Sequence, residues 1–346
     1  MAPIRFGIIS HETMGERTRQ ALTNHPDAVI VATCNLGPAS GAAVEIADWQ
    51  TLLSRDDLDA IFIATPNAIA PAIIIAALGK GLHVFCQHLP GYNLEDVINV
   101  RRAEAAATGK ILKFSFGHRY HGAVMKAREL AESGTLGSLL SMRGTYGKAG
   151  RGADQGRWEN TFDLSGGGIL MDRGIHMIDL MHMFAGPFEE IKAMVDERFW
   201  TGAGVEDNAM ALLRTNSGVM AMLHASATQW RETFRLELGF ETGYLWLDGV
   251  LTADMRCAPE MLIIGRLQYD EHGEPIANPE EEIHEFKADE SVDLEIADFI
   301  STLQTGRKLQ VGTSQQAFDA INTSQRLYAA DPTYLHKSQE GGHGDD

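Results

Sequence analysis

The first third of the chain alternates short apolar runs with amphipathic segments. Ile4–Ile9 is the first apolar run, and a helical pattern follows it from residue 15. The predicted strands are 4–9, 27–34, 59–65, 82–86 and 111–116, and the predicted helices are 15–23, 71–78 and 94–109. This alternation predicts βαβ units with right-handed crossovers, hence a Rossmann-like, doubly wound parallel sheet. Ligands of such sheets bind at the carboxyl ends of the strands.

Beyond residue 117 the pattern changes to a long series of strands framed by helices. The predicted helices are 124–133, a segment starting at 169, 294–303 and 314–328, and the predicted strands are 139–146, 191–195, 209–213, 219–225, 235–240 and 243–247. We therefore divide the chain into a Rossmann-like domain (1–117), a second α/β domain (118–330) and a loose tail (331–346).

One stretch of the second domain carries an acid, a base and another acid. After the glycines 166–168, the predicted helix places Asp172 and His176 four residues apart, and Asp179 three residues further. Residues with this spacing share a helical face. The flanking residues are strongly apolar, and a buried Asp–His pair needs a reason. An acid beside a histidine is what a proton-transfer site requires, so we predict His176 and Asp172 as catalytic residues.

The turn after the first strand is where a dinucleotide pyrophosphate would bind. The three glycine positions of the G-x-G-x-x-G fingerprint hold Ser10, Glu12 and Gly15 here. Glu12 places a negative charge where an anion should bind. The second strand ends in Asn35 instead of an acid, and residues 36–41 leave little room for a crossover helix before a short predicted strand at 44–47. The fingerprint is therefore degenerate.

Charge and cysteine content narrow the class of protein. The formal net charge of −18 argues against nucleic acid and anionic membranes as partners. The cysteines number three and form no CxxC pair, which gives no disulfide framework and no zinc ribbon. The chain opens without a signal peptide and holds no apolar run of membrane-spanning length, so we expect a cytoplasmic protein.

A set of short motifs, in order along the chain, resembles the Gfo/Idh/MocA family of sugar, inositol and related oxidoreductases. The motifs are Gly7–Ile9 with Met14-Gly15, Ala64–Asn67, His83–Cys86, Phe116–Tyr120, Gly166–Gly168, Asp172-x-Gly-x-His176-x-x-Asp179 and Val205–Asp207. The resemblance covers almost the full length of the chain. It implies a Rossmann domain followed by an α/β domain with an open, mostly antiparallel sheet, which makes the contact in a homo-oligomer.

The resemblance also implies NAD or NADP as cofactor and a small-molecule substrate. The residues expected at the cofactor are Ser10, Met14, Gly15, Asn35, Thr65, Pro66, Asn67 and Gln87. The family's Glu-Lys-Pro motif is replaced by Gln87, His88 and Leu89, and His88 would stand in for the catalytic lysine or be a plain polar residue at a strand end. We expect Arg119, Arg157, Arg173 and Asp179 at the substrate. The polar loop 147–159, which includes Lys148, would face the substrate or be a solvated surface loop. Arg173 would alternatively pair with an acid such as Asp163.

A metal site is a minority hypothesis. His11, His88, His118, His121 and His176 all fall near the expected cleft, but the sequence has no HxH, HExxH or CxxC spacing. We therefore assign no metal ligand.

Three functions remain open. The first is an NAD(P)-dependent dehydrogenase acting on a polyol, sugar or hydroxy acid. The second is a redox-neutral lyase or decarboxylase, metal-assisted or not, that has lost the dinucleotide. The third is a non-catalytic sensor or partner subunit. The altered positions all lie on the cofactor side, whereas the Asp172 and His176 side is intact.

Overall fold

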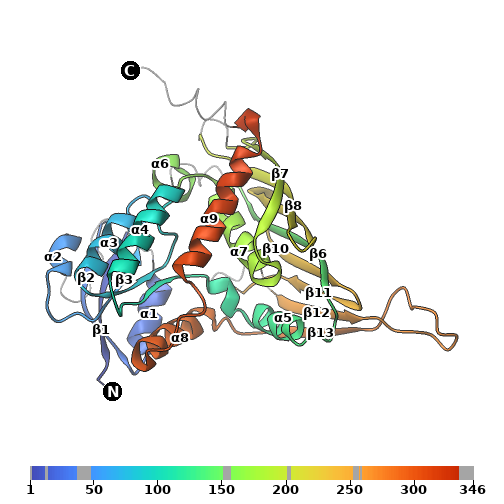
Figure 1. Ribbon diagram of the computed structural model, residues 1–346, viewed down its shortest axis with the longest axis horizontal. Helices are drawn as coiled ribbons and strands as arrows, with labels where there is room; N and C mark the ends of the chain where they lie inside the picture. Colours follow the sequence, from blue (N-terminus) through green and yellow to red (C-terminus); the bar gives the residue numbers. More distant parts are fainter. Residues whose placement is uncertain are drawn as a thin grey trace. The chain divides into compact units, whose positions relative to one another are not determined.

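A computed structural model describes residues 2–11, 15–36, 48–150, 157–200, 204–251, 257 and 259–334 (Figure 1). The chain forms two compact units. The first comprises Met1–Gly117, Asp163–Gly166 and Ser291–Asn322, and the second comprises His118–Phe162, Gly167–Glu290 and Thr323–Asp346. Residues 291–322 lie in the first unit, whereas the sequence analysis grouped them with the second domain.

The first unit is built on a five-stranded parallel sheet with strand order β2-β1-β3-β4-β5. Its strands are β1 (Ile4–Ser10), β2 (Ala28–Asn35), β3 (Ala60–Ala64), β4 (His83–Cys86) and β5 (Leu112–Phe114). Its helices are α1 (Glu16–Asn24), α2 (Trp49–Leu53), α3 (Ala70–Gly79), α4 (Leu94–Ala106) and α8 (Ser291–Thr305). The predicted Rossmann-like, doubly wound sheet is confirmed. The predicted strand at 44–47 lies outside the described residues.

Helix α8 belongs to this unit because its apolar side chains complete the unit's core. Ile296, Phe299 and Ile300 pack with Leu22 of α1 and with residues of the strands such as Phe85. Figure 1 shows α1 and α8 together beside these strands. Helix α8 comes after most of the second unit in the sequence. The spacing of its apolar residues therefore predicts a helix, but it does not show which of the two cores the helix joins.

The second unit contains an eight-stranded sheet with strand order β13-β12-β11-β10-β6-β9-β8-β7. The strands are β6 (Leu139–Ala149), β7 (Phe188–Asp196), β8 (Asn208–Thr215), β9 (Met220–Ser226), β10 (Thr228–Phe240), β11 (Gly243–Asp248), β12 (Glu260–Arg266) and β13 (Glu281–Phe286). All neighbouring pairs are antiparallel except β6 and β9, which are parallel. The expected open, mostly antiparallel sheet is confirmed.

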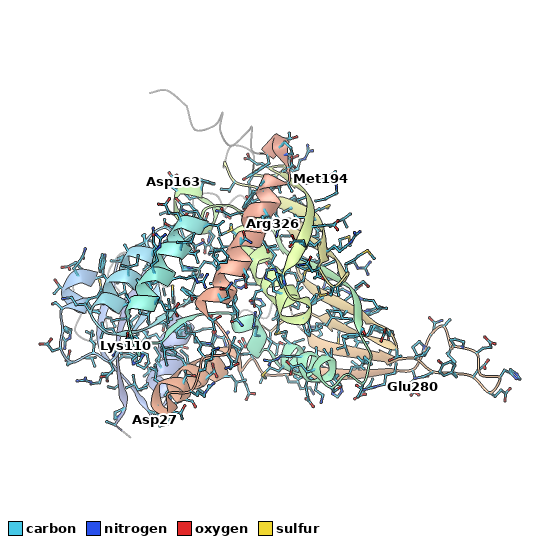
Figure 2. All side chains as sticks on the ribbon, in the orientation of Figure 1. Asp27, Lys110, Asp163, Met194, Glu280 and Arg326 are labelled. Atoms are coloured by element: carbon cyan, nitrogen blue, oxygen red, sulfur yellow. The ribbon has the colours of Figure 1, made fainter. Side chains whose placement is uncertain are left out.

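Among the described residues, α5 (Gly122–Glu132) and α7 (Ile175–Ala185) pack on this sheet. The other helical segments are η1 (Gly117–Tyr120), η3 (Trp158–Asn160), η4 (Leu170–Gly174), α6 (Phe162–Ser165), most of which belongs to the first unit, and α9 (Ser314–Ala329), which passes from the first unit into the second after Asn322. The core residues of α5 and α7 pack on alternate side chains of the strands. Figure 1 shows α5 and α7 beside the sheet. The last part of α9 is fastened to this unit by Arg326, labelled in Figure 2, which donates to the carbonyls of Phe188 and Glu189.

Strands β12 and β13 and helix α2 were not predicted. Strand β13 has the sequence Glu-Glu-Ile-His-Glu-Phe, whose six residues are exposed or half-buried, so little apolar alternation marks it. Helix α2 has only five residues. No helix in the described ranges is long and apolar enough to cross a membrane.

Candidate active site

The segment that carries Asp172, His176 and Asp179 begins where the backbone of Gly168 closely approaches that of Glu206. A Cβ atom on Gly168 would lie 2.0 Å from the carbonyl oxygen of Glu206, so only glycine fits there. The buried carboxylate of Glu206 accepts hydrogen bonds from the amides of Gly168 and Leu170, both at 2.9 Å. Two hydroxyls, those of Tyr328 and Tyr334, donate to the same carboxylate. Glu206 therefore fixes the start of the helical segment.

The first turn of this segment is a π-helix, not the α-helix that we predicted. It spans Leu170–Gly174, and α7 begins at Ile175. A π turn bonds residue i to i+5, and such turns are frequent at functional sites. Asp172 lies in this π turn and His176 in the first turn of α7, so the predicted α-helical geometry does not hold throughout the interval between them.

The polar residues of the segment are partly exposed, whereas their apolar neighbours are buried in the core. Asp172, Arg173 and His176 are half-buried, whereas the intervening residues are buried, namely Gly174 and Ile175 with Met171 before them and Met177 and Ile178 after them. The segment therefore presents three polar side chains from a buried apolar support.

Asp172 is bound to a lysine that the sequence analysis did not assign to it. Its Oδ2 accepts a hydrogen bond of 2.9 Å from Lys148 Nζ, and Arg173 Nε lies 3.6 Å from the same oxygen. Burial would raise the pKa of Asp172, but the charges of Lys148 and Arg173 outweigh it and hold this pKa well below its usual value. Asp172 is therefore a permanent carboxylate that orients the Lys148 ammonium group.

His176 lies against a second histidine. The ring of His118 stacks on that of His176 with a centroid distance of 4.6 Å and an interplanar angle of 29°. Burial, followed by the neighbouring charges, lowers the pKa of His118 well below its ordinary value, so His118 is neutral.

Tyr146 connects His118 to Arg173. Its hydroxyl accepts from Arg173 Nη1 at 2.8 Å and lies 3.1 Å from His118 Nε2. Since the oxygen already accepts from Arg173, we assign its own hydrogen to His118 Nε2, which leaves the hydrogen of that ring on Nδ1. Burial raises the pKa of Tyr146, in keeping with a protonated hydroxyl. The expected acid beside Arg173 was one such as Asp163; the structure places Asp172 and Glu232 there instead.

Arg119 and Asp179 form a buried ion pair with each other. Arg119 Nε and Nη2 donate to the two carboxylate oxygens at 2.7 and 2.6 Å, and the side chains are 7% and 2% exposed. Burial raises the pKa of Asp179, against the effect of Arg119. Both side chains are thus engaged with each other, and the substrate contact that we expected of them stays a prediction. Arg157 is exposed and pairs with Glu159.

The residues expected at the cofactor gather at the carboxyl edge of the first unit's sheet. Ser10 and Asn35 are register partners at the ends of β1 and β2. Thr65, Pro66 and Asn67 follow β3, and Gln87 and His88 follow β4. His88 is half-buried and its backbone hydrogen-bonds the thiol of Cys86, whose pKa burial raises to about 12. Met14 and Glu12 lie outside the described residues.

Gly15 makes the turn that leads into α1. Its φ is 77°, and a Cβ atom there would lie 2.7 Å from the ring of Phe62 and 3.0 Å from Gln87 Oε1. Glycine is therefore required for conformation and for space. As the N-cap of α1 it offers no side-chain hydrogen bond to the first turn.

Buried polar atoms at this edge fit a dinucleotide. Within the described part of the chain, His11 Nδ1, Thr65 Oγ1, Asn67 Oδ1 and Gln87 Oε1 are buried and have no hydrogen-bond partner. Such atoms cost free energy unless a ligand or water satisfies them. The hydroxyl, phosphate and amide groups of a dinucleotide supply the missing partners, at the place where doubly wound sheets bind ligands. By contrast, no group of three metal-ligating side chains occurs among the residues that the structure describes.

Sequence reasoning missed the supporting residues of the site. Tyr146 and Glu232 carry no local motif. Glu206 was noted only as part of the Val205–Asp207 motif, and Lys148 only as part of a polar loop. Tyr146 and Lys148 are alternate residues of β6, so they lie on the same face of that strand. Their contacts with Arg173 and Asp172 of the π turn form only in the folded chain.

Comparisons with known proteins define the class. A model described as an oxidoreductase family with an NAD-binding Rossmann fold matches residues 4–114, and the GFO/IDH/MocA C-terminal domain matches residues 124–246. Together the matches span well over half of the sequence, and the chain belongs to the GFO/IDH/MocA family of oxidoreductases.

Individual relatives are sugar dehydrogenases. Levoglucosan dehydrogenase of Pseudarthrobacter phenanthrenivorans is 26% identical over 206 residues, which is 52% of this chain and 52% of that protein. The aligned region thus spans about half of that relative. D-xylose 1-dehydrogenase (NADP(+)) 2 of Haloferax volcanii is 24% identical over 345 residues, covering 95% of this chain and 97% of its own. A solved structure of levoglucosan dehydrogenase with NADH and levoglucosan has a TM-score of 0.83 at 19% identity, covering 96% of this chain and 98% of that one, a likeness of fold.

Proposed function

We propose that this protein is an NAD(P)-dependent dehydrogenase or reductase that acts on a hydroxyl or carbonyl group of a neutral sugar or polyol. The observation that carries the proposal is the set of buried polar atoms without protein partners at the carboxyl edge of the first sheet. The acid–base cluster of the second unit supports it. When bound, the dinucleotide exchanges a hydride with the substrate carbon.

The first unit holds the cofactor. Gly15 would leave room for the phosphates at the start of α1, where the helix dipole favours an anion. Thr65, Asn67 and Gln87 supply hydrogen-bonding groups to the polar parts of the dinucleotide. Asn35, at the end of β2, would offer a hydrogen bond to a ribose hydroxyl.

The second unit handles the proton. In the oxidation direction His176 accepts the hydroxyl proton of the substrate as the C–H bond breaks and the carbonyl forms. Lys148, held by Asp172, donates a hydrogen bond to the same oxygen and stabilises the negative charge that develops on it. His88 assists at the cofactor side in the position of the family's lysine.

The charge balance of the cluster selects a neutral substrate. Two cations, Lys148 and Arg173, lie beside two carboxylates, Asp172 and Glu232. The charges compensate one another, so a substrate carboxylate or phosphate would meet no net positive charge. Hydroxyl groups, which both donate and accept, match this surface better than the hydroxy acid that we also considered.

We further propose a homo-oligomer formed through the outer face of the second unit's sheet. Met194, Met210, Leu212, Met220 and Met222 are exposed on neighbouring strands β7, β8 and β9. Met194 is labelled in Figure 2 near the end of β7. A monomer rarely exposes so contiguous an apolar patch, and a second copy covers it with the same residues.

Turnover tests the proposal. The protein is assayed with NAD⁺ and NADP⁺ against levoglucosan, D-xylose and myo-inositol, with reduced cofactor followed by absorbance. His176→Ala is expected to lower kcat by about 100-fold or more, the scale of a lost general base, while cofactor affinity is kept. His272→Ala, at an exposed histidine, is the control. Full activity of the His176 variant would mean that the catalytic base lies elsewhere.

A further inference from the structure

An exposed aromatic pair lies on the second unit. The rings of Phe199 and Trp230 meet edge to face with centroids 5.2 Å apart. They are 38% and 67% exposed, respectively. Trp230 has a φ of 58°, and it is the only residue other than glycine with a positive φ in the described ranges. A bulky residue in this conformation is an outlier that points toward function.

A bulge in β10 holds Trp230 outward. The pairing of β10 with β6 shifts between Thr228 and Thr233, so residues 229–232 leave the ladder. Gly147 on β6 makes room for the bulge, because a Cβ atom on Gly147 would lie 2.4 Å from Gln229 Cγ. Bulges re-aim side chains next to active sites.

The partner ring is also held firmly. The Asp207 carboxylate accepts hydrogen bonds from the backbone amides of Arg198 and Trp200, at 3.0 and 2.8 Å, and from the amide of Phe199 between them. Phe199 is thus fixed in a tight loop on a buried carboxylate. The two aromatic side chains therefore form a rigid surface and not a pair of mobile loop residues.

Two short connections join this surface to the acid–base cluster. Trp200, next to Phe199, lies beneath Lys148, whose Nζ is 5.3 Å from its ring centroid and bonds Asp172. Glu232, two residues beyond Trp230, lies 4.0 Å from Arg173. The aromatic pair and the charged cluster are thus parts of one neighbourhood in the second unit.

We propose that Trp230 and Phe199 form a stacking surface for the ring of the sugar substrate and set its specificity for ring-closed over open-chain polyols. The inference rests on the proposed function. The C–H face of a pyranose ring is apolar and packs flat on an aromatic ring, while its hydroxyls at the rim reach charged side chains such as Lys148 and Glu232. An open-chain polyol has no fixed apolar face to offer.

The test compares Trp230→Ala and Trp230→Phe with wild type on methyl β-D-glucopyranoside, whose ring cannot open, and on sorbitol. Trp230→Ala should raise KM for the glucoside by about tenfold and leave kcat within about twofold, since stacking acts on binding. KM for sorbitol should stay unchanged, and Trp230→Phe should restore most of the glucoside affinity. Tyr269→Ala, at an aromatic residue 59% exposed, is the matched control.

Several outcomes would contradict the proposed stacking role of Trp230 and Phe199. Equal changes for both ligands, or none, would overturn the inference. So would a change in molecular mass of Trp230→Ala, which would assign the pair to contact between copies. Calorimetric titration with the glucoside measures the same affinity difference without turnover, and failure of wild type to bind it would also overturn the inference. Failure of the proposed function is separate, because it shows as no cofactor reduction by the wild-type protein with any of the sugars and polyols tested.

Discussion

Two aspartates a few residues apart have opposite roles because of their nearest cations. Asp172 is half-buried and bonds Lys148 with Arg173 close by, so its carboxylate stays charged and oriented beside His176. Asp179 is buried and has both oxygens occupied by Arg119. The same residue type thus lies once half-buried beside a lysine and once in a fully buried ion pair.

The buried Arg119–Asp179 pair gives a stability prediction. Asp179→Asn leaves the Arg119 charge buried without a counter-ion, and we expect a loss of about 3–5 kcal/mol in the free energy of unfolding. Glu132→Gln, which breaks the exposed Arg128–Glu132 pair, should cost less than about 1 kcal/mol. Denaturant unfolding measures both. If Asp179→Asn is as stable as wild type but loses substrate affinity, the residue binds substrate after all.

At the scale of elements, the π turn and Glu206 set the backbone that carries the proposed catalytic side chains. Hydrophobic periodicity predicted a helix here, and its polar residues Asp172, Arg173 and His176 are the half-buried ones of the segment. It could not predict the π turn, because the turn depends on the Glu206 carboxylate, which lies more than thirty residues away and holds the Gly168 and Leu170 amides. The same limit applies to Lys148 and Tyr146, whose approach depends on sheet pairing and not on local pattern.

Helix α7 also carries a pH-dependent contact. His182 Nε2 and Thr323 Oγ1 are 3.1 Å apart, and burial, with the charges of Arg119 and Arg326, lowers the pKa of His182 to about 4. In the unfolded chain this pKa is about 6.5, so the unfolded state binds the extra proton first as pH falls. Stability is therefore lost between about pH 6.5 and 4, by about 2 kcal/mol at pH 5 from this residue.

His182→Gln removes that titration. The difference in unfolding free energy between pH 7.5 and pH 5 should be smaller in the variant by about 2 kcal/mol. His272→Gln, at an exposed site, should leave the difference unchanged. An unaltered pH sensitivity in His182→Gln would show that its neutral form contributes nothing to folding.

At the scale of the whole molecule, the sequence predicted two sheets of different kinds, and both are present. Its chain-order division failed for α8, because the core that receives Phe299 is formed by residues near the N-terminus. The degenerate fingerprint at Ser10 and Asn35 weakened the case for a dinucleotide. The unsatisfied buried atoms at Thr65, Asn67 and Gln87 strengthen it, and no sequence pattern reveals them.

The proposed oligomer gives a prediction at this scale. Leu212 lies in the exposed apolar patch, where it is the register partner of Met222. Leu212→Glu should convert the oligomer to monomers in light scattering, because two copies would bury like charges against each other. Met125→Glu, at an exposed methionine of α5, should leave the assembly intact. A monomeric wild-type protein at tens of micromolar would rule out this interface.

The central claim is that the first unit binds a dinucleotide despite its altered fingerprint. Calorimetric titration of the wild-type protein with NADH and with NADPH tests it most directly, with Gly15→Val as the variant in which the turn and the space beside Gln87 are lost. We expect at least one dinucleotide to bind with a dissociation constant of roughly 1 μM to 1 mM, and Gly15→Val to abolish the signal. Absence of binding of both cofactors at millimolar concentration would contradict the account and favour a redox-neutral enzyme.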